Sequence, residues 1–150
     1  MSDPIYQLWR YNNWANKMVL SEFIKQADAV PATCLHLLSH VVNTQMIWLS
    51  RINGEQPTVG VWQDHSTLEC ERYHTISSQA LQLKVEHYRE GGKHVVRYTN
   101  TKNISFETSL PDILLHIFNH GTYHRAQIAS EMRRNGLEPL NTDYITFVRT

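Results

Sequence analysis

Cysteines, basic runs and long apolar segments are scarce or missing in this sequence, and each shortage argues against a class of protein. The two cysteines, Cys34 and Cys70, lie far apart and outside any Cys-x-x-Cys spacing, so we expect buried free thiols and a reducing, cytoplasmic location. Lys and Arg together equal Asp and Glu at 14 each, which argues against a nucleic-acid partner bound through its phosphates. No apolar run approaches membrane-spanning length and no signal-peptide core is found, so we expect no membrane association.

What is present is the composition of an ordinary globular protein. Hydrophobic residues make up 41% of the chain and charged residues 19%. A chain of 150 residues is long enough to bury a core without the help of a disulfide or a metal. We therefore expect one domain that spans residues 1–150.

Capping signals and apolar periodicity predict four helices. Each predicted start has Pro, Ser or Asp at a position that suits a helix N-terminus, and glycine marks three of the predicted ends. The helices are expected from Asp3-Pro4 to about Lys25, from Pro31 to about Asn53-Gly54, from Ser66 to Gly91-Gly92, and from Ser109 to Arg133–Gly136.

The connections between these helices differ in kind. Residues 55–65 are long for a turn between antiparallel helices, so they predict a crossover. Residues 93–108 alternate apolar and polar side chains, which predicts a short β-hairpin or an extended loop on the bundle. Residues 139–150 are expected to form an irregular tail. The predicted fold class is all-α, a four-helix bundle with a long crossover and a possible hairpin before the last helix.

The second helix is apolar over most of its circumference. A helix of this kind is either the central helix of the fold or a contributor to a subunit interface. We expect it to take part in a homodimer, and the zero formal net charge is compatible with self-association.

Two histidines in the fourth helix occupy positions where a bundle helix usually carries Leu or Ile. His120 and His124 lie on the same line as Ile117 and Ile128, one turn apart, which is a spacing that suits a single metal ion. They could equally be core histidines with ordinary hydrogen bonds. His116 lies roughly 60° off this line. Periodicity does not place His40, in the second helix, at the centre of the apolar stripe.

Familiar metal motifs are absent around these histidines. A zinc peptidase helix needs His-Glu-x-x-His, and here Gly121 stands in the Glu position. A di-iron bundle needs two Glu-x-x-His pairs, and the chain has one, Glu71 with His74.

Four segments in this order give the chain a family resemblance. They are YNNWANKMVL (residues 11–20), LLSHVVNTQMIWLSRI (37–52), NHGTYHRAQI (119–128) and the ending Thr142-Asp143-Tyr144. The chain resembles the DinB-like (DinB/YfiT) superfamily of small metal-binding four-helix proteins over nearly its whole length. One departure is Ala126, where family members commonly have glycine.

This resemblance implies a metal site that the residues alone do not assign. His40 joins His120 and His124 as a three-histidine site for a divalent metal, and His36, one turn before His40, is the rival ligand. Zinc and nickel both suit imidazole ligands. Related proteins are thiol-dependent transferases and isomerases, so the resemblance implies an enzyme that activates a low-molecular-weight thiol or water. The alternative is a non-catalytic metal-binding or stress-response protein.

The sequence assigns no catalytic residue, and the supporting roles are interpretations. Arg51, Tyr123 and Arg125 are expected to form surface or interface salt bridges. Arg51 and Arg125 are also the candidates for a proton shuttle or a clamp on the carboxylate of a thiol near the open metal position. A second set of side chains was read as supporting the site: Asn119 and Gln127 as hydrogen-bond partners of the imidazoles, and Asn12, Trp14 and Asn16 as pocket lining.

Overall fold

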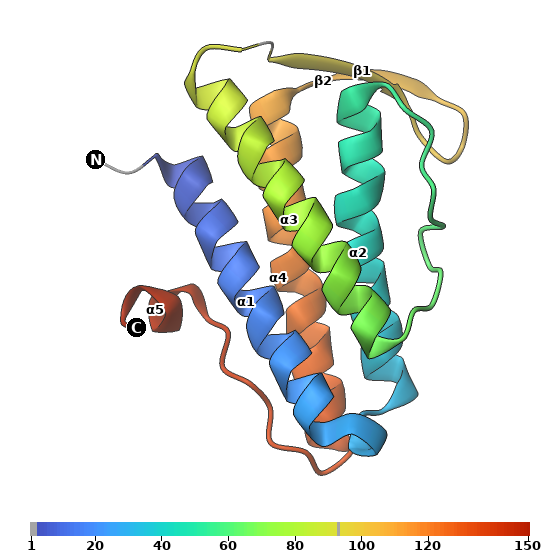
Figure 1. The fold of residues 1–150 in the computed structure, drawn as a ribbon, viewed down its shortest axis with the longest axis vertical. Coiled ribbons are helices and arrows are strands. Elements are labelled where there is room, and N and C mark those ends of the chain that lie inside the picture. Colours follow the sequence, from blue (N-terminus) through green and yellow to red (C-terminus); the bar gives the residue numbers. More distant parts are fainter. Residues whose placement is uncertain (1–2, 93) are drawn as a thin grey trace.

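Four long helices form a bundle, and a small hairpin closes one of its ends (Figure 1). The structure is a computed structural model that describes residues 3–92 and 94–150. A short 3-10 helix follows the first long helix at Ala27–Ala29. The four long helices are α1 (Pro4–Gln26), α2 (Ala32–Asn53), α3 (Thr67–Arg89) and α4 (Leu110–Arg134).

The helix boundaries lie where the capping residues predict them. The Asp3 side chain accepts hydrogen bonds from the first backbone amides of α1. Ser66 and Glu69 form a reciprocal capping box at the start of α3. Gly54 ends α2 with a φ of 70°, a left-handed conformation that glycine adopts without strain. These local signals confirm the four predicted helices to within one or two residues.

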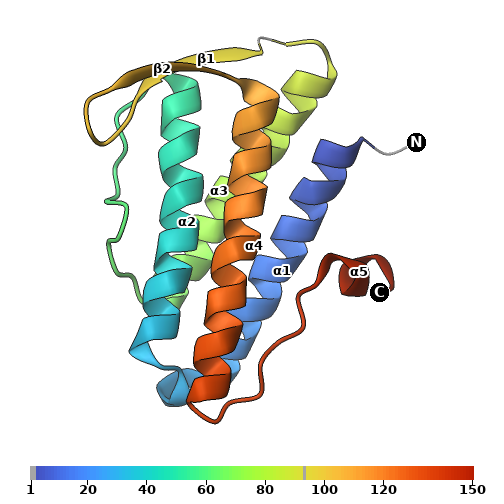
Figure 2. The same ribbon diagram turned by 180° about the vertical axis from the view of Figure 1, so that it is seen from behind.

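The connection between α2 and α3 is a crossover, as predicted. Residues 54–66 run back along the length of the bundle, so that α2 and α3 point the same way while α1 and α4 point the opposite way (Figures 1 and 2). This arrangement places α2 beside α4 in antiparallel orientation, and their packing is the most extensive between any two elements. Side chains on the facing sides of α2 and α4 can therefore meet.

The predicted hairpin is confirmed. Strand β1 (Val95–Thr99) pairs antiparallel with β2 (Ser105–Ser109), with Val95 opposite Ser109. Lys93, where the predicted segment begins, lies outside the described residues. The hairpin lies across the ends of α2 and α4 (Figure 1), where β1 contacts α2 and β2 contacts α4.

The bundle interior consists of two apolar clusters with a polar layer between them. One cluster lies towards the hairpin and includes Leu81, Leu110 and Phe118. The other lies towards the opposite end and includes Phe23 and Met132. Between them the middle turns of the helices bury polar side chains, chiefly Asn12, Asn16, Asn43, Gln45, His74 and Arg125.

Helix α2 is the central helix of the fold. It packs on α3, on α4 and on β1. The crossover also contacts it through hydrogen bonds. Its nearly continuous apolar circumference is therefore covered within a single chain. In the part of the chain that the structure describes, no helix is long and apolar enough to cross a membrane.

The C-terminal tail is more regular than predicted. Residues 144–148 form a short helix, α5 (Tyr144–Val148), which packs against α1. Its aromatic residues provide the reason, because Tyr144 and Phe147 both contact the ring of Tyr11 edge-on. The expectation of an irregular tail was wrong for these five residues.

Candidate metal centre

The three histidines singled out by the sequence meet between α2 and α4. The Nε2 atom of His120 lies 3.1 Å from Nε2 of His40 and 3.0 Å from Nε2 of His124. His40 comes from α2, whereas His120 and His124 come from consecutive turns of α4. His40 and His124 are buried, each with 6% of its surface exposed, and His120 is half-buried. Three nitrogens from two facing helices thus converge on one point.

Hydrogen bonds to the outer ring nitrogens orient two of these imidazoles. Nδ1 of His40 donates to the backbone carbonyl of Val61 at 2.8 Å, and Nδ1 of His124 donates to Oε1 of Gln127 at 2.7 Å. Because both partners accept, the proton of each neutral ring lies on Nδ1 and the Nε2 lone pair faces inwards. The predicted role of Gln127 as a partner of a ligand imidazole agrees with this contact.

Burial favours the neutral forms of His120 and His40. Desolvation, followed by the neighbouring His124, His40 and His116, lowers the pKa of His120 from 6.5 to about 3. Desolvation also lowers the pKa of His40, partly opposed by the hydrogen bond to Val61. Neutral imidazoles with converging lone pairs are the ligands that a divalent cation such as zinc or nickel requires. The donor set therefore fits a metal ion.

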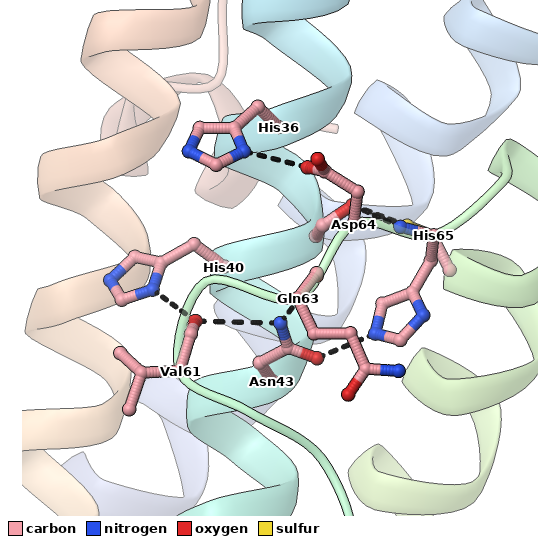
Figure 3. Close-up of polar contacts among 9 residues, drawn as sticks. His36, His40, Asn43, Val61, Gln63, Asp64 and His65 are labelled. Carbon is pink, nitrogen blue, oxygen red and sulfur yellow. Dashed lines mark hydrogen bonds and ion pairs between the residues drawn. The ribbon is translucent and has the colours of Figure 1, made fainter.

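The crossover holds His40 in place (Figure 3). Nδ2 of Asn43 donates to the carbonyls of Gln63, at 2.8 Å, and Val61, at 3.4 Å. The side chain of His65 donates to Oδ1 of Asn43 at 2.7 Å. The carbonyl that orients His40 is thus fixed by a second residue of α2, one turn further along the helix.

Trp62 covers the outer face of the same imidazole. Its ring stacks on His40 with a centroid separation of 3.7 Å and an interplanar angle of 9°. Neither Val61 nor Trp62 could be identified from the sequence, because a backbone carbonyl and a loop tryptophan have no periodicity that relates them to a helix face.

The two rival histidines lie outside the cluster. His36 pairs with Asp64 through Nδ1 and Oδ1 at 2.6 Å (Figure 3). The ring of His36 also stacks on that of Trp62. His116 approaches His120 with ring centroids 5.7 Å apart. Among the described residues, the three-residue group whose ligand atoms lie within 4.8 Å of one another is His40, His120 and His124. Their predicted role as ligands is consistent with this geometry and stays a prediction.

Arg125 does not form the surface or interface salt bridge that its sequence position suggested. It is buried, with 3% of its surface exposed, and donates to Oδ1 of Asn12 at 3.0 Å and Oδ1 of Asn16 at 2.7 Å. Its Nε has no hydrogen-bond partner in the described part of the chain. Asn12 and Asn16 therefore belong to the polar layer around Arg125, and the contacts given for them do not reach the three histidines.

Gly121, which lies between His120 and His124 in sequence, makes room for this arginine. A Cβ atom at position 121 would lie 2.7 Å from both Nη1 of Arg125 and Oδ1 of Asn12. These distances are too short for nonbonded atoms, so a side chain there would push Arg125 and Asn12 apart. Sequence reasoning used Gly121 to exclude a peptidase and missed this packing role.

The remaining side chains for which the sequence suggested a role are Arg51, Tyr123, Asn119 and Trp14. Arg51 has no carboxylate partner in residues 3–92 and 94–150; it stacks over the ring of Trp48 at 4.5 Å. The side chain of Tyr123 is exposed. Asn119 is also exposed, and Trp14 packs against Phe147 of α5.

A cavity of about 370 Å³ opens beside the cluster. His40 and His120 border this cavity, whereas His124 does not. A small molecule in the cavity would therefore reach the cluster at His40 and His120. A larger hollow of about 660 Å³ lies near His36 and Glu131, and none of the three histidines borders it. The smaller cavity is lined by His40, Thr44, Ile47, Trp48, Arg51, Val61, Tyr98, Asn100, Thr101, Phe106, His116 and His120.

Comparison with known proteins places this sequence in a family. A family model described as "DinB family" matches residues 1–150. Among curated proteins, the chain is similar to "Protein DinB" of Bacillus subtilis (strain 168), with 24% identity over 160 residues. That alignment covers 96% of this chain and 93% of the relative.

Proposed function

The chain belongs to the DinB family, and on this premise we propose that it binds one divalent metal ion through His40, His120 and His124 and acts on a small thiol or on water. The observation that carries the proposal is that Nε2 of His120 lies 3.1 Å from Nε2 of His40 and 3.0 Å from Nε2 of His124. Three neutral imidazoles whose lone pairs face one another are stabilised by a cation at their centre.

A metal-free alternative for the cluster is a single proton on Nε2 of His120. That proton would be shared between His40 and His124, because the outer nitrogens of both these rings already carry one. A second proton on His120 is disfavoured, since its pKa is about 3. The metal-bound state satisfies all three nitrogens at once, and we favour it for this reason.

The cavity supports an enzyme over a purely structural site. When bound, a divalent ion supplies Lewis-acid chemistry that makes a thiol or a water molecule more acidic. The residues of this chain leave one side of the cluster open to a cavity of about 370 Å³, which is a suitable size for a small molecule. His40 and His120 border that opening, and the ring of Trp62 and the carbonyl of Val61 hold His40 in place. Thiol-dependent S-transfer is the reaction class we propose.

The metal is zinc or nickel in this proposal, because both ions suit imidazole ligands. A cytoplasmic location agrees with the two cysteines, which are free and buried. Desolvation raises the pKa of both the Cys34 and Cys70 thiols to about 11, so neither is poised to react. Any thiol in the reaction must therefore come from a small molecule.

The test is metal analysis of protein purified without added metal, together with a screen of small thiols against electrophiles. We expect about one metal ion per chain, lost in His120→Ala. His116→Ala and His36→Ala are matched controls, because each lies one turn before a proposed ligand in the same helix, and both should keep the metal.

The outcomes separate the possibilities. Loss of metal in His36→Ala or His116→Ala, with retention in His40→Ala, would refute the ligand assignment. One metal ion per chain with no turnover of any thiol would favour the non-catalytic metal-binding protein.

A further inference from the structure

We propose that Arg51 binds an oxyanionic group of the small molecule that occupies the cavity beside the three histidines. The ligand would carry a carboxylate, sulfonate or phosphate at one end and face the histidines with the other. This inference rests on the proposed function for the site and adds the class of its ligand.

Arg51 is a positive charge without a carboxylate partner among residues 3–92 and 94–150. Its guanidinium carbon lies 4.5 Å from the ring centroid of Trp48 and 5.6 Å from that of Tyr98. Its Nε is shielded from solvent and has no acceptor, and no ion pair involves Arg51 in the described part of the chain. Desolvation lowers its pKa, which means that burial disfavours the charged form. An anion in the cavity would offset this cost.

The cavity walls contain cationic and neutral groups but no acid. Besides Arg51, the titratable residues that line it are His40, His116, His120 and Tyr98. Neither Asp nor Glu is among the lining residues. The whole chain has equal numbers of acidic and basic residues, so this one-signed lining is a local feature. With a divalent ion on the histidines, the cavity would become still more positive and would favour an anionic occupant.

Arg51 and His40 lie on the same face of α2. Arg51 follows His40 by eleven residues. That spacing is about three turns, so both side chains leave the helix in nearly the same direction, roughly 16 Å apart along the axis. Helical side chains lean towards the N-terminus, which brings the guanidinium back towards the cluster. A short molecule in the cavity can therefore contact both Arg51 and the histidines.

The hairpin closes the Arg51 end. Tyr98, Asn100, Thr101 and Phe106 come from β1, the turn and β2, and all four border the cavity. Arg51 also borders a second hollow of about 310 Å³, with Lys84 and Arg97, but none of the three proposed ligands His40, His120 and His124 borders that hollow. The first cavity is thus the one that connects Arg51 with the candidate metal centre.

The alternative is that Arg51 only anchors the hairpin by stacking between Trp48 and Tyr98. A structural role of this kind predicts loss of stability without any preference for charged ligands. Pairs of probes that differ only in charge can therefore separate the two roles.

The first experiment is calorimetric titration of the zinc-loaded, full-length protein with thiols that differ only in their far end. The probes are 3-mercaptopropionate against 3-mercapto-1-propanol, and 6-mercaptohexanoate against 6-mercaptohexanol. We expect the better-fitting acid to bind about 10- to 100-fold more tightly than its alcohol, as is typical of a hydrogen-bonded charge pair. Arg51→Gln should remove this preference and leave the affinity for the alcohol within about threefold. Arg89→Gln is the matched control, because Arg89 also stacks over a ring, that of Tyr6, and does not border the cavity.

The second experiment separates this inference from the metal assignment. Metal-free protein is titrated with hexanoate, hexanesulfonate, hexyl phosphate and hexanol. Arg51-dependent binding of an anion over hexanol supports the anion site whether or not the protein binds metal, and the order of the three anions identifies the preferred oxyanion. Equal binding of anions and hexanol, or equal weakening of all probes by Arg51→Gln with a lower melting temperature, would overturn it. Absence of metal from the purified protein would count against the proposed function alone.

Discussion

Arg125 is a positive charge in the centre of the bundle, and no carboxylate pairs with it in the part of the chain that the structure describes. Two asparagine oxygens on α1 accept from its guanidinium, and their amide nitrogens both donate to Oε1 of Gln45 on α2, at 3.0 Å each. Neutral acceptors satisfy the hydrogen bonds of a buried cation but do not neutralise its charge, so the arrangement depends on close geometry. The bare glycine at position 121 provides that geometry.

Gly121→Ala should therefore destabilise the protein. In an ordinary helix this substitution gains up to about 1 kcal/mol, because alanine is the better helix former. Here the new Cβ would lie 2.7 Å from Arg125 and Asn12, and overpacking of this kind costs about 1–3 kcal/mol. We expect a net loss of roughly 1–2 kcal/mol in the free energy of unfolding, measured by chemical denaturation. Ser130→Ala, an exposed position on α4, is the control and should change stability by less than about 0.5 kcal/mol. An unchanged or higher stability of Gly121→Ala would show that the Arg125 network tolerates a side chain.

At the scale of elements, the crossover is what joins the candidate site to the fold. It contacts α2 at Ser39, His40 and Asn43, within little more than one helical turn, and its own partners there are mainly backbone atoms. A connection of this length without secondary structure commonly has a function of its own. Here it sets the tautomer and the orientation of His40.

Asn43→Ala tests this dependence. The substitution removes the donor that fixes the Val61 and Gln63 carbonyls and the acceptor for His65. Partners that orient ligand residues typically change metal affinity by about 10- to 100-fold, and we expect a loss in that range on titration with zinc. Gln56→Ala, at an exposed position of the same crossover, should leave affinity unchanged. Equal affinities for the two variants would mean that His40 keeps its orientation without the crossover.

The helices could be predicted from the sequence because their signals are local. A capping box at Ser66 and a left-handed glycine at position 54 act within a single turn of chain. His120 and His124 could be paired by their spacing for the same reason. His40 required the family resemblance, since its place depends on how α2 and α4 face each other across 80 residues of chain. Arg125 was misread because a helix surface pattern does not reveal that asparagines of another helix surround it.

At the scale of the whole molecule, the homodimer stays a prediction. The apolar circumference of α2 is covered within one chain, so a second copy must use other surface. Helix α3 exposes Leu68, Ile76 and Leu83 on one side, and we expect the partner to pack there. The interface should bury more than about 1,000 Å² in total. Sedimentation should give a dimer for the wild type and a monomer for Ile76→Glu, with Gln56→Glu as the control. A monomeric wild type at micromolar concentration would refute the prediction.

The stability of the whole chain should depend on pH even without metal. Burial lowers the pKa of His74 from 6.5 to about 4, and its ring donates to Asn13 and faces Gln45 and Asn16 in the neutral form. The unfolded chain therefore binds more protons than the folded chain between pH 6.5 and 4. The contribution of His74 to the free energy of unfolding is fully present above pH 6.5 and is lost as the pH falls through this window. The loss from this one group is at most roughly 3 kcal/mol. Melting curves of the metal-free protein should show the decrease, and His74→Gln should flatten it.

Bound metal should make the acid response steeper. A site made of imidazoles must stay deprotonated to hold its ion, and free histidine has a pKa near 6.5. Metal affinity should fall between about pH 7 and pH 5 with more than one proton coupled to binding. Because the ion stabilises the folded state by mass action, the melting temperature of the metal-loaded protein should approach that of the metal-free protein across the same window. The lowered pKa values of His120 and His40 act the other way, since they keep both rings available for the ion at lower pH. A protein that keeps its metal and its melting temperature at pH 5 would indicate carboxylate ligands, and Glu71 and Asp143 would be the first residues to substitute.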